Sequence, residues 1–292
     1  MEKGDVRTWT IGAVTITRIA EMVDVIPWAA LFPEEQADLH RRHDWLSPNY
    51  VTANGEIRLA LQAFVVSAGS RRIIVDTCVG NDKEREIPAC HHLQTAFLQD
   101  LASAGFPPES IDTVLCTHLH FDHVGWNTRL VNGKWVPTFP NARYLFGRRE
   151  WEHARSLLAI PDVPTGHVTD SVMPVIDAGL ADFVESDHRV CDEVWLEPTP
   201  GHTPGHVSVR IASQGADAVI TGDLMHSPAQ MVEPDMSSHA CFEPEASQRT
   251  RRAFLERYQD GKALVVGSHF CDPTVGWVER EGDHWRFRGQ GS

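Results

Sequence analysis

Residues 117–125 read Thr117-His118-Leu119-His120-Phe121-Asp122-His123-Val124-Gly125 and follow an apolar run at residues 111–116 that is typical of a buried strand. Side chains two residues apart at a strand end point the same way, so His118 and His120 can reach one cation together. The chain must then turn, which directs Asp122 and His123 toward a second cation. Two metal ions about 3.5–4 Å apart form the clamp used in metal-assisted hydrolysis. This stretch therefore predicts a metal site and not a group of solvated surface histidines.

The pattern His-x-His-x-Asp-His resembles the metallo-β-lactamase-fold hydrolase superfamily. Further motifs follow in the order of that family from Asp76 to His269, so the resemblance extends over nearly the whole chain. It implies an α/β fold, a four-layer αββα sandwich in which two similar halves pack sheet against sheet. We expect one domain over residues 1–292, since α/β enzymes of this length often form a single unit.

The second half of the chain contains a stiff turn after an apolar strand at residues 194–198. Residues 199–206 hold two Pro-Gly pairs, which favour a rigid turn, with one histidine after each. A rigid turn suits a metal ligand, because little backbone freedom remains to be lost on binding. The resemblance implies that His202 is the third ligand of the cation held by His118 and His120, whereas we expect His206 to support the site or to bond to the backbone.

Three more strands end in a candidate residue. Residues 218–222 lead into Asp223, and residues 263–268 lead into His269. The resemblance implies that Asp223 bridges both metals and that His269 is the last ligand. Asp76 ends an apolar strand and resembles the family's brace of the metal loop, so we expect it to support the site without ligating. Cys78 stands where relatives usually have glycine.

The seven predicted ligands thus form two sets of three, one for each metal, and one residue that bridges the metals. Nitrogen-rich ligands with carboxylates suit two zinc ions, and iron, manganese or cobalt are also accepted by these donors. Zinc lowers the pKa of bound water from 15.7 to roughly 7, so the predicted reaction is attack by a metal-bridging hydroxide. Asp122 and His226 are the residues predicted to act in catalysis. The predicted ligands are His118, His120 and His202 for one metal, Asp122, His123 and His269 for the other, and Asp223 between them.

Two positions bear on the substrate. True β-lactamases carry Cys or Ser where this chain has Asp223, which argues against a β-lactam substrate. Homoserine-lactone hydrolases of this fold usually have Tyr three places later, where this chain has His226, a side chain that can also donate a proton. Our leading interpretation is hydrolysis of a small ester, first of all a lactone. The alternatives are a phosphotriester or aryl-ester hydrolase, a mononuclear iron thiol or persulfide dioxygenase, and a catalytically silent binding protein.

The composition limits the kinds of binding partner and the cellular compartment that we expect for this protein. The formal charge of −14 and the lack of a Lys/Arg-rich run argue against nucleic acid and favour a small-molecule substrate. The start at residues 1–5 has no leader, and nowhere do eighteen apolar residues run together, so we expect a cytoplasmic protein without membrane contact. The six cysteines are scattered, which predicts reduced thiols, with Cys116 as a small core residue.

Residues 22–58 contain apolar and polar clusters without a simple period. We predict a lid over the metals or an arm reaching a second subunit of a homodimer, and the alternative is a long connection packed on the core. Walls of the substrate pocket are expected in residues 22–58, 80–92 and 224–242. The regular elements expected are hairpins at residues 6–20, 131–135 and 277–288, strands at 59–67, 72–76 and 142–146, and helices at 91–104, 148–158 and 244–258.

Overall fold

The computed structural model describes residues 6–291. Residues 1–5, where no leader is predicted, and Ser292 lie outside the described part. The described residues divide into two compact units: unit 1 holds residues 6–22 and Leu61–His188, and unit 2 holds Val23–Ala60 and residues 189–291. Each unit contains a hydrophobic core of its own. The single domain over residues 1–292 stays a prediction.

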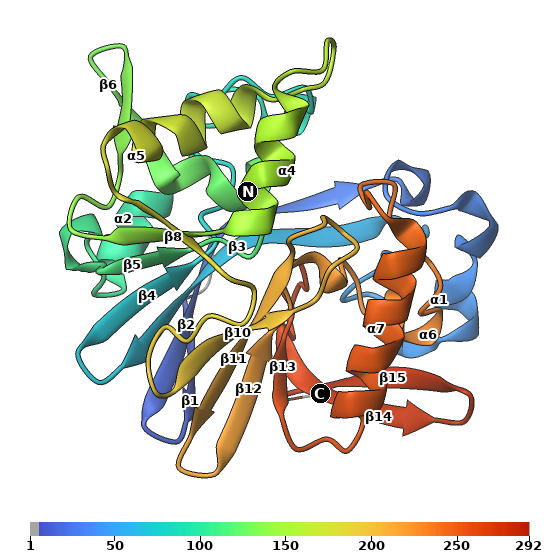
Figure 1. The fold of residues 1–292 in the computed structure, drawn as a ribbon. Helices are drawn as coiled ribbons and strands as arrows, with labels where there is room; N and C mark the ends of the chain where they lie inside the picture. The colour runs from blue at the N-terminus through green and yellow to red at the C-terminus, as the bar shows by residue number, and fades with distance from the viewer. Residues whose placement is uncertain (1–5, 292) are drawn as a thin grey trace. The chain divides into compact units, whose positions relative to one another are not determined.

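Unit 1 is built on a seven-stranded sheet, to which β2 contributes its residues up to Met22 and β3 its residues from Leu61. Helices α2, α4 and α5 bury apolar side chains in the same core as strands β4, β5 and β8, and Figure 1 labels these elements. The strand order is β1 (Arg7–Ile11), β2 (Val14–Ile26), β3 (Ile57–Ala68), β4 (Arg71–Val75), β5 (Thr113–Leu115), β8 (Arg143–Gly147) and β9 (Ala181–Val184), with parallel pairing from β4 onward. The helices are α2 (Phe97–Ser103), α3 (Phe121–Val124), α4 (Arg148–Leu157) and α5 (Met173–Asp177), with a π-turn η7 (Val168–Val172) and a separate hairpin of β6 (Thr128–Val131) and β7 (Lys134–Pro137).

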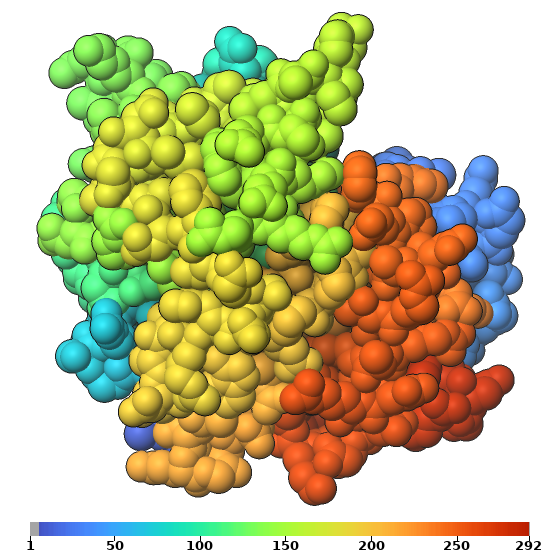
Figure 2. Space-filling view, in the orientation of Figure 1, coloured from blue at the N-terminus to red at the C-terminus, as the bar shows by residue number. Residues whose placement is uncertain are grey.

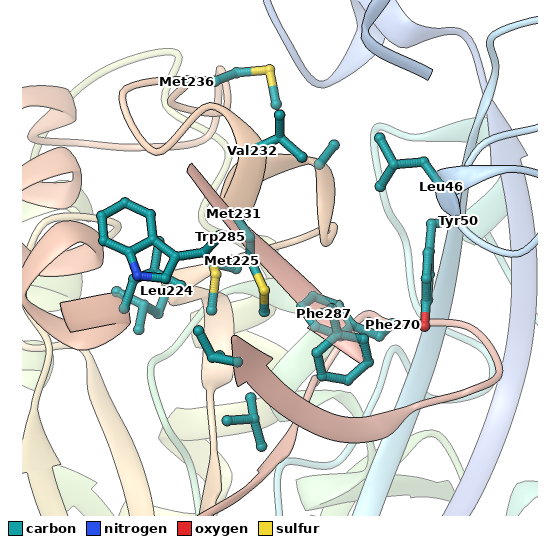
Figure 3. Packing of buried hydrophobic residues seen from close by; sticks show 14 of the residues in the cluster. Leu46, Tyr50, Leu224, Met225, Met231, Val232, Met236, Phe270, Trp285 and Phe287 are labelled. Carbon is teal, nitrogen blue, oxygen red and sulfur yellow. The ribbon is translucent and has the colours of Figure 1, made fainter. Parts of the chain in front are cut away.

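Unit 2 is built on a six-stranded sheet whose core is shown in Figure 3. Met225, Met231, Phe270 and Trp285 come from different elements and are all buried in this cluster. Helix α7 is orange in Figure 2, and its residues Arg252 and Glu256 are exposed. The strand order is β10 (Val194–Pro198), β11 (Val207–Ser213), β12 (Ala216–Ile220), β13 (Leu264–Val266), β14 (Val275–Glu281) and β15 (His284–Gly289), and the helices are α1 (Leu39–Arg42), α6 (Ala229–Val232) and α7 (Pro244–Tyr258).

Short 3-10 turns connect these elements in both units. Those of unit 1 are η4 (Pro88–Cys90), η5 (Pro108–Ser110) and η6 (Gly125–Asn127), and those of unit 2 are η1 (Trp28–Ala30), η2 (Glu34–Gln36), η3 (Asp44–Leu46) and η8 (Gly222–Leu224). Most of the elements expected from the sequence are present, and β1 and β2 form the predicted opening hairpin.

The helix expected over residues 91–104 is wrong in its first half, because α2 begins only at Phe97. The Leu93 carbonyl accepts a hydrogen bond from the Asp82 amide at 3.1 Å, and the Thr95 amide donates to Asn81 Oδ1 at 2.8 Å. The backbone before Phe97 therefore bonds to residues 81–82 and not to a helix of its own.

The bounds of α7 match the predicted helix, and its buried face includes a charged residue. Ala253 is exposed, whereas Ser247, Arg251 and Leu255 are buried. Arg251 donates hydrogen bonds to backbone carbonyl oxygens of neighbouring segments. A helix pattern that scores only apolar residues misses such a position.

The segment of residues 22–58 packs its large apolar side chains into the core of unit 2. Trp28, Phe32, Leu39 and Leu46 are all buried there. This packing matches the alternative of a connection that covers the core, and the role as a lid or dimer arm stays a prediction.

The six cysteines are all free, and Cys116 packs in the core of unit 1, as predicted. Within residues 6–291 every helix is too short or too polar to cross a membrane.

Candidate metal centre

Unit 1 gathers the four donors of the opening stretch at the end of β5. His118 and His123 are buried, and His120 and Asp122 are partly exposed. The His118 ring centroid lies 4.6 Å from that of His120 and 4.1 Å from that of His123. Asp122 Oδ2 lies 3.7 Å from His123 Nε2. Each of the four is a candidate metal ligand, and we call them the unit 1 half-site.

Asp76 lies beneath this half-site, at the end of β4, with a left-handed φ of 57°. Its carboxylate accepts hydrogen bonds from the Thr117 amide at 2.8 Å and from the Thr117 hydroxyl at 2.9 Å. Asp76 Oδ2 also lies 2.9 Å from His123 Nδ1. A carboxylate at this distance keeps the proton on Nδ1, which leaves Nε2 of His123 available to a metal.

A close backbone contact holds the far end of the loop. The Gly125 amide donates to the Cys78 carbonyl at 2.8 Å, and a Cβ at Gly125 would lie 1.8 Å from the Val79 carbonyl oxygen. No residue other than glycine fits there. Cys78 is buried and adopts a left-handed φ of 50°.

Sequence reasoning missed one carboxylate next to the loop. The Leu119 amide donates to Glu150 Oε1 at 3.1 Å, and Glu150 is buried on α4. Its signal in the sequence is a charged residue four places before the buried Ala154, on the inward face of an amphipathic helix.

In unit 2, three imidazoles converge on the carboxylate of Asp223. His202 Nε2 and His226 Nε2 lie 3.3 Å and 3.1 Å from Oδ2, and His269 Nε2 lies 3.0 Å from Oδ1. All four side chains are buried. His202, Asp223 and His269 are candidate metal ligands, and we call them the unit 2 half-site. They come from the turn after β10, from η8 after β12, and from the end of β13.

His206 supports this half-site through hydrogen bonds. Its Nε2 accepts from the Asp223 amide at 2.8 Å, which places the proton on Nδ1 facing the Thr199 carbonyl at 2.9 Å. Both ring nitrogens therefore have protein partners, and His206 fixes the backbone of Asp223, as the sequence suggests. His269 has its Nδ1 at 3.0 Å from the Ala60 carbonyl oxygen, which leaves Nε2 for Asp223 or a metal.

His226 is held through its backbone amide and through its ring. Its amide donates to Gln230 Oε1 at 2.7 Å, and its ring stacks on His269 with centroids 5.6 Å apart. Within residues 6–291 its Nδ1 has no hydrogen-bond partner, although the side chain is only 4% exposed. A buried polar atom of this kind is suited to a hydrogen bond with a bound molecule.

A buried charged network in unit 1 was not found from the sequence. Lys83 Nζ donates to Thr128 Oγ1 at 2.6 Å and lies over the Trp135 ring, and Arg85 forms two hydrogen bonds with Asp170. Burial lowers the pKa of Lys83 to about 7, and Asp170 opposes that shift. Burial is the main cause that lowers the pKa of His167 to about 4, and the positive charge of Arg85 lowers it further. His167 is therefore neutral at pH 7.

The elements that carry the candidate ligands also match a known protein family. The family model of the Metallo-beta-lactamase superfamily matches residues 59–269. The chain belongs to this superfamily. The matched range begins in β3 and ends at His269, so it includes every candidate ligand named above.

Relatives and solved structures agree with this assignment. An N-acyl homoserine lactonase of Bacillus thuringiensis is 25% identical over 170 residues, which cover 58% of this chain and 60% of that enzyme. The aligned part thus spans about three fifths of the relative's length. The hydrolase AbOPH of the beta lactamase superfamily has a TM-score of 0.81 at 21% identity, covering 100% of this chain and 99% of that one. AidC, a dizinc quorum-quenching lactonase, has a TM-score of 0.78 at 18% identity, with coverage of 100% and 99%. The metallo-β-lactamase fold predicted from the sequence is therefore confirmed.

Proposed function

We propose that this chain is a metal-dependent hydrolase of a small ester, with a lactone as the leading substrate class. The observation that carries the proposal is the convergence of the Nε2 atoms of His202, His226 and His269 on the buried carboxylate of Asp223. Imidazoles and carboxylates are the ligands of catalytic zinc, and a buried cluster of them has no simpler structural role.

The donor atoms of each half-site fit a metal ion. In unit 1 the Nδ1 of His123 faces Asp76, and in unit 2 the Nδ1 of His269 faces a backbone carbonyl, so both rings present Nε2 as the donor. Ligating histidines in metal sites are supported in this way. We propose that the two half-sites together hold two divalent cations, zinc first and iron, manganese or cobalt as alternatives. His118, His120 and His202 would bind one, Asp122, His123 and His269 the other, and Asp223 would bridge them.

Cations bound by these residues would acidify a water molecule and polarise the substrate oxygen. The protein residues position these events. Asp223 offers one carboxylate oxygen to each of the two proposed cations. Its Oδ2 faces His202, a proposed ligand of the first cation, and its Oδ1 faces His269, a proposed ligand of the second. Asp122 is the acidic ligand of unit 1 and, with His226, the proposed catalytic residue. The free Nδ1 of His226 is the atom we propose to contact the substrate.

The preference for a lactone rests on the relatives, which are named as N-acyl homoserine lactonases, and on Asp223 at the bridging position. The formal charge of −14 supports a neutral or weakly charged small molecule over nucleic acid.

The test combines metal analysis with a panel of lactones, thioesters, aryl esters and phosphotriesters. We expect close to two divalent metals per chain and the fastest turnover on a lactone, since seven donors are too many for one tetrahedral ion. A stable content of one metal, with Asp122 and His269 dispensable, would refute the dinuclear proposal. One iron per chain would favour the dioxygenase, and a metal-loaded protein without any turnover would favour a binding protein.

A further inference from the structure

The loop that carries His202 is held by residues 241–250, which include the first half of α7. The Phe242 amide donates to the His202 carbonyl at 2.8 Å, and the Glu243 amide donates to the Gly201 carbonyl at 2.9 Å. The Thr250 hydroxyl donates to the Pro200 carbonyl at 2.7 Å. The backbone of the proposed ligand loop is therefore fixed by α7 and its N-terminal approach, all within unit 2.

The same segment places a thiol beside the His202 ring. Cys241 Sγ lies 3.7 Å from His202 Nδ1, and the Cys241 side chain is buried. The Sγ atom also lies 3.5 Å from Ser238 Oγ, and it donates to Ser247 Oγ at 3.6 Å. Ser247 Oγ accepts in turn from the guanidinium of Arg251 at 2.9 Å. The thiol hydrogen thus points away from His202, so that the sulfur presents its lone pairs to the ring.

The position of the sulfur decides which nitrogen of His202 can hold a metal. His202 Nε2 faces Asp223, so Nε2 is the proposed donor and Nδ1 must carry the proton. A buried N–H needs an acceptor. His123 has the carboxylate of Asp76 at this place, and His269 has a backbone carbonyl. At His202 the acceptor is sulfur, which accepts hydrogen bonds more weakly than oxygen.

We propose that Cys241 is a positioning residue of the metal centre, which accepts the Nδ1–H of His202 and so holds the ring with Nε2 toward the metal. This inference rests on the proposed function, because it assumes that His202 is a ligand. It also predicts that the cation held by His202 is bound less tightly than one whose histidine faces a carboxylate, because a weaker acceptor makes the ligand less basic.

The test measures zinc affinity by competition with a chromophoric chelator in three variants. Cys241→Val replaces the acceptor with an apolar side chain, Cys241→Ser keeps an acceptor, and Cys191→Ala removes a thiol of unit 2 that bonds to Glu193. We expect Cys241→Val to weaken one of the two zinc sites by about 10–100-fold, the usual effect of losing such a partner. The second site should keep its affinity, Cys241→Ser should recover most of the loss, and Cys191→Ala should match wild type.

A second readout separates positioning from mere packing. In zinc-loaded protein with labelled histidine, the Nδ1–H resonance of His202 should shift in Cys241→Ser, because the acceptor changes from sulfur to oxygen. Equal zinc affinities in wild type and Cys241→Val would overturn the role of Cys241. If Cys241→Val does not fold, an unshifted resonance in Cys241→Ser overturns it instead. Wild-type protein that binds no zinc would be a different result, since it would overturn the proposed function itself.

Discussion

The two half-sites obtain their donors in different ways. In unit 1, His118, His120, Asp122 and His123 come from one loop after β5. In unit 2, His202, Asp223 and His269 come from three separate strand ends, which are held together by the sheet and by α7. The local sequence therefore shapes the first half-site, and the packing of distant segments shapes the second.

The supporting groups differ in the same way. Unit 1 supports its loop with the carboxylate of Asp76, whereas unit 2 uses neutral groups, namely the imidazole of His206, the thiol of Cys241 and the Ala60 carbonyl. The charge of a supporting group should therefore matter more in unit 1, whereas steric fit should matter in both units.

The largest effect is expected at Asp223, the residue on which unit 2 converges. Asp223→Ala should lower kcat/KM by about 10³-fold or more, because generation of the nucleophile and polarisation of the substrate are together worth several kcal/mol. Metal content should fall in parallel, as measured by mass spectrometry of the purified protein. A variant that keeps a tenth of the activity would show that Asp223 is not the bridge.

His226 tests whether unit 2 also contributes to the chemistry beyond metal binding. His226→Ala should lower kcat by about 10²–10⁴-fold, typical of a positioned acid, with metal content unchanged. The measurement is kcat against pH for wild type and His226→Phe, both fully loaded with metal. His239→Ala serves as the control, because His239 is an exposed histidine of the same unit. Identical kcat values and alkaline limbs in wild type and His226→Phe would exclude His226 from the reaction.

Asp76 tests the importance of charge in unit 1. Asp76→Asn suits the left-handed backbone and removes the charge that faces His123, so zinc affinity should fall by about 10–100-fold. The matched control is Asp82→Asn, since Asp82 also has a left-handed φ, 64°, but bonds to Gln94. Equal losses of zinc affinity in both variants would mean that the effect comes from the left-handed backbone and not from the charge that faces His123.

Glycine substitutions test steric fit in both units. Gly201 has φ 131°, and a Cβ there would lie 2.2 Å from the Ser247 amide nitrogen. Gly201→Ala should therefore cost about 1–3 kcal/mol or more in urea unfolding. Gly215→Ala is the control in unit 2, since its Cβ meets nothing within 4 Å and only its φ of 81° adds strain. Gly125→Ala should be as costly in unit 1, and equal stabilities of the Gly201 and Gly215 variants would refute the close contact at Gly201.

The smallest effect concerns Lys83 in unit 1. Its pKa is about 7 in the folded protein and near 10.4 in an unfolded chain, so the unfolded state binds more protons between these values. Stability should therefore rise with pH from about 7 toward 10 through this group. Lys83→Met should flatten that rise, measured as Tm at pH 7 and pH 9 in equal buffer. An unchanged slope would mean that Lys83 stays protonated in its contact with Asp170.

The sequence predicted local features of both units better than contacts between distant residues. The metal loop and the strand ending at Asp76 could be predicted because their residues are neighbours in sequence or end apolar strands. The supporting groups Glu150, Cys241 and Arg251 could not, because each acts across many residues of chain and sits on the inward face of an element or in an irregular segment. The late start of α2 had the same cause, since the Asn81 side chain accepts the Thr95 amide and the Asp82 amide donates to the Leu93 carbonyl.

The hydrogen bonds of Arg251 have a consequence for which substitutions residues 224–236 can accept during evolution. It grips the carbonyl oxygens of Leu224, Pro234 and Met236, and touches no side chain of that segment in these bonds. The path of residues 224–236 is therefore held in part by main-chain oxygens that every amino acid possesses, together with the Gln230 side chain, which bonds to the backbone of His226 and Met236. Side chains along it that are not buried, such as those of Glu233 and Asp235, can be exchanged by mutation while these bonds remain. A chain built in this way can diverge in what it recognises without first having to evolve a new loop.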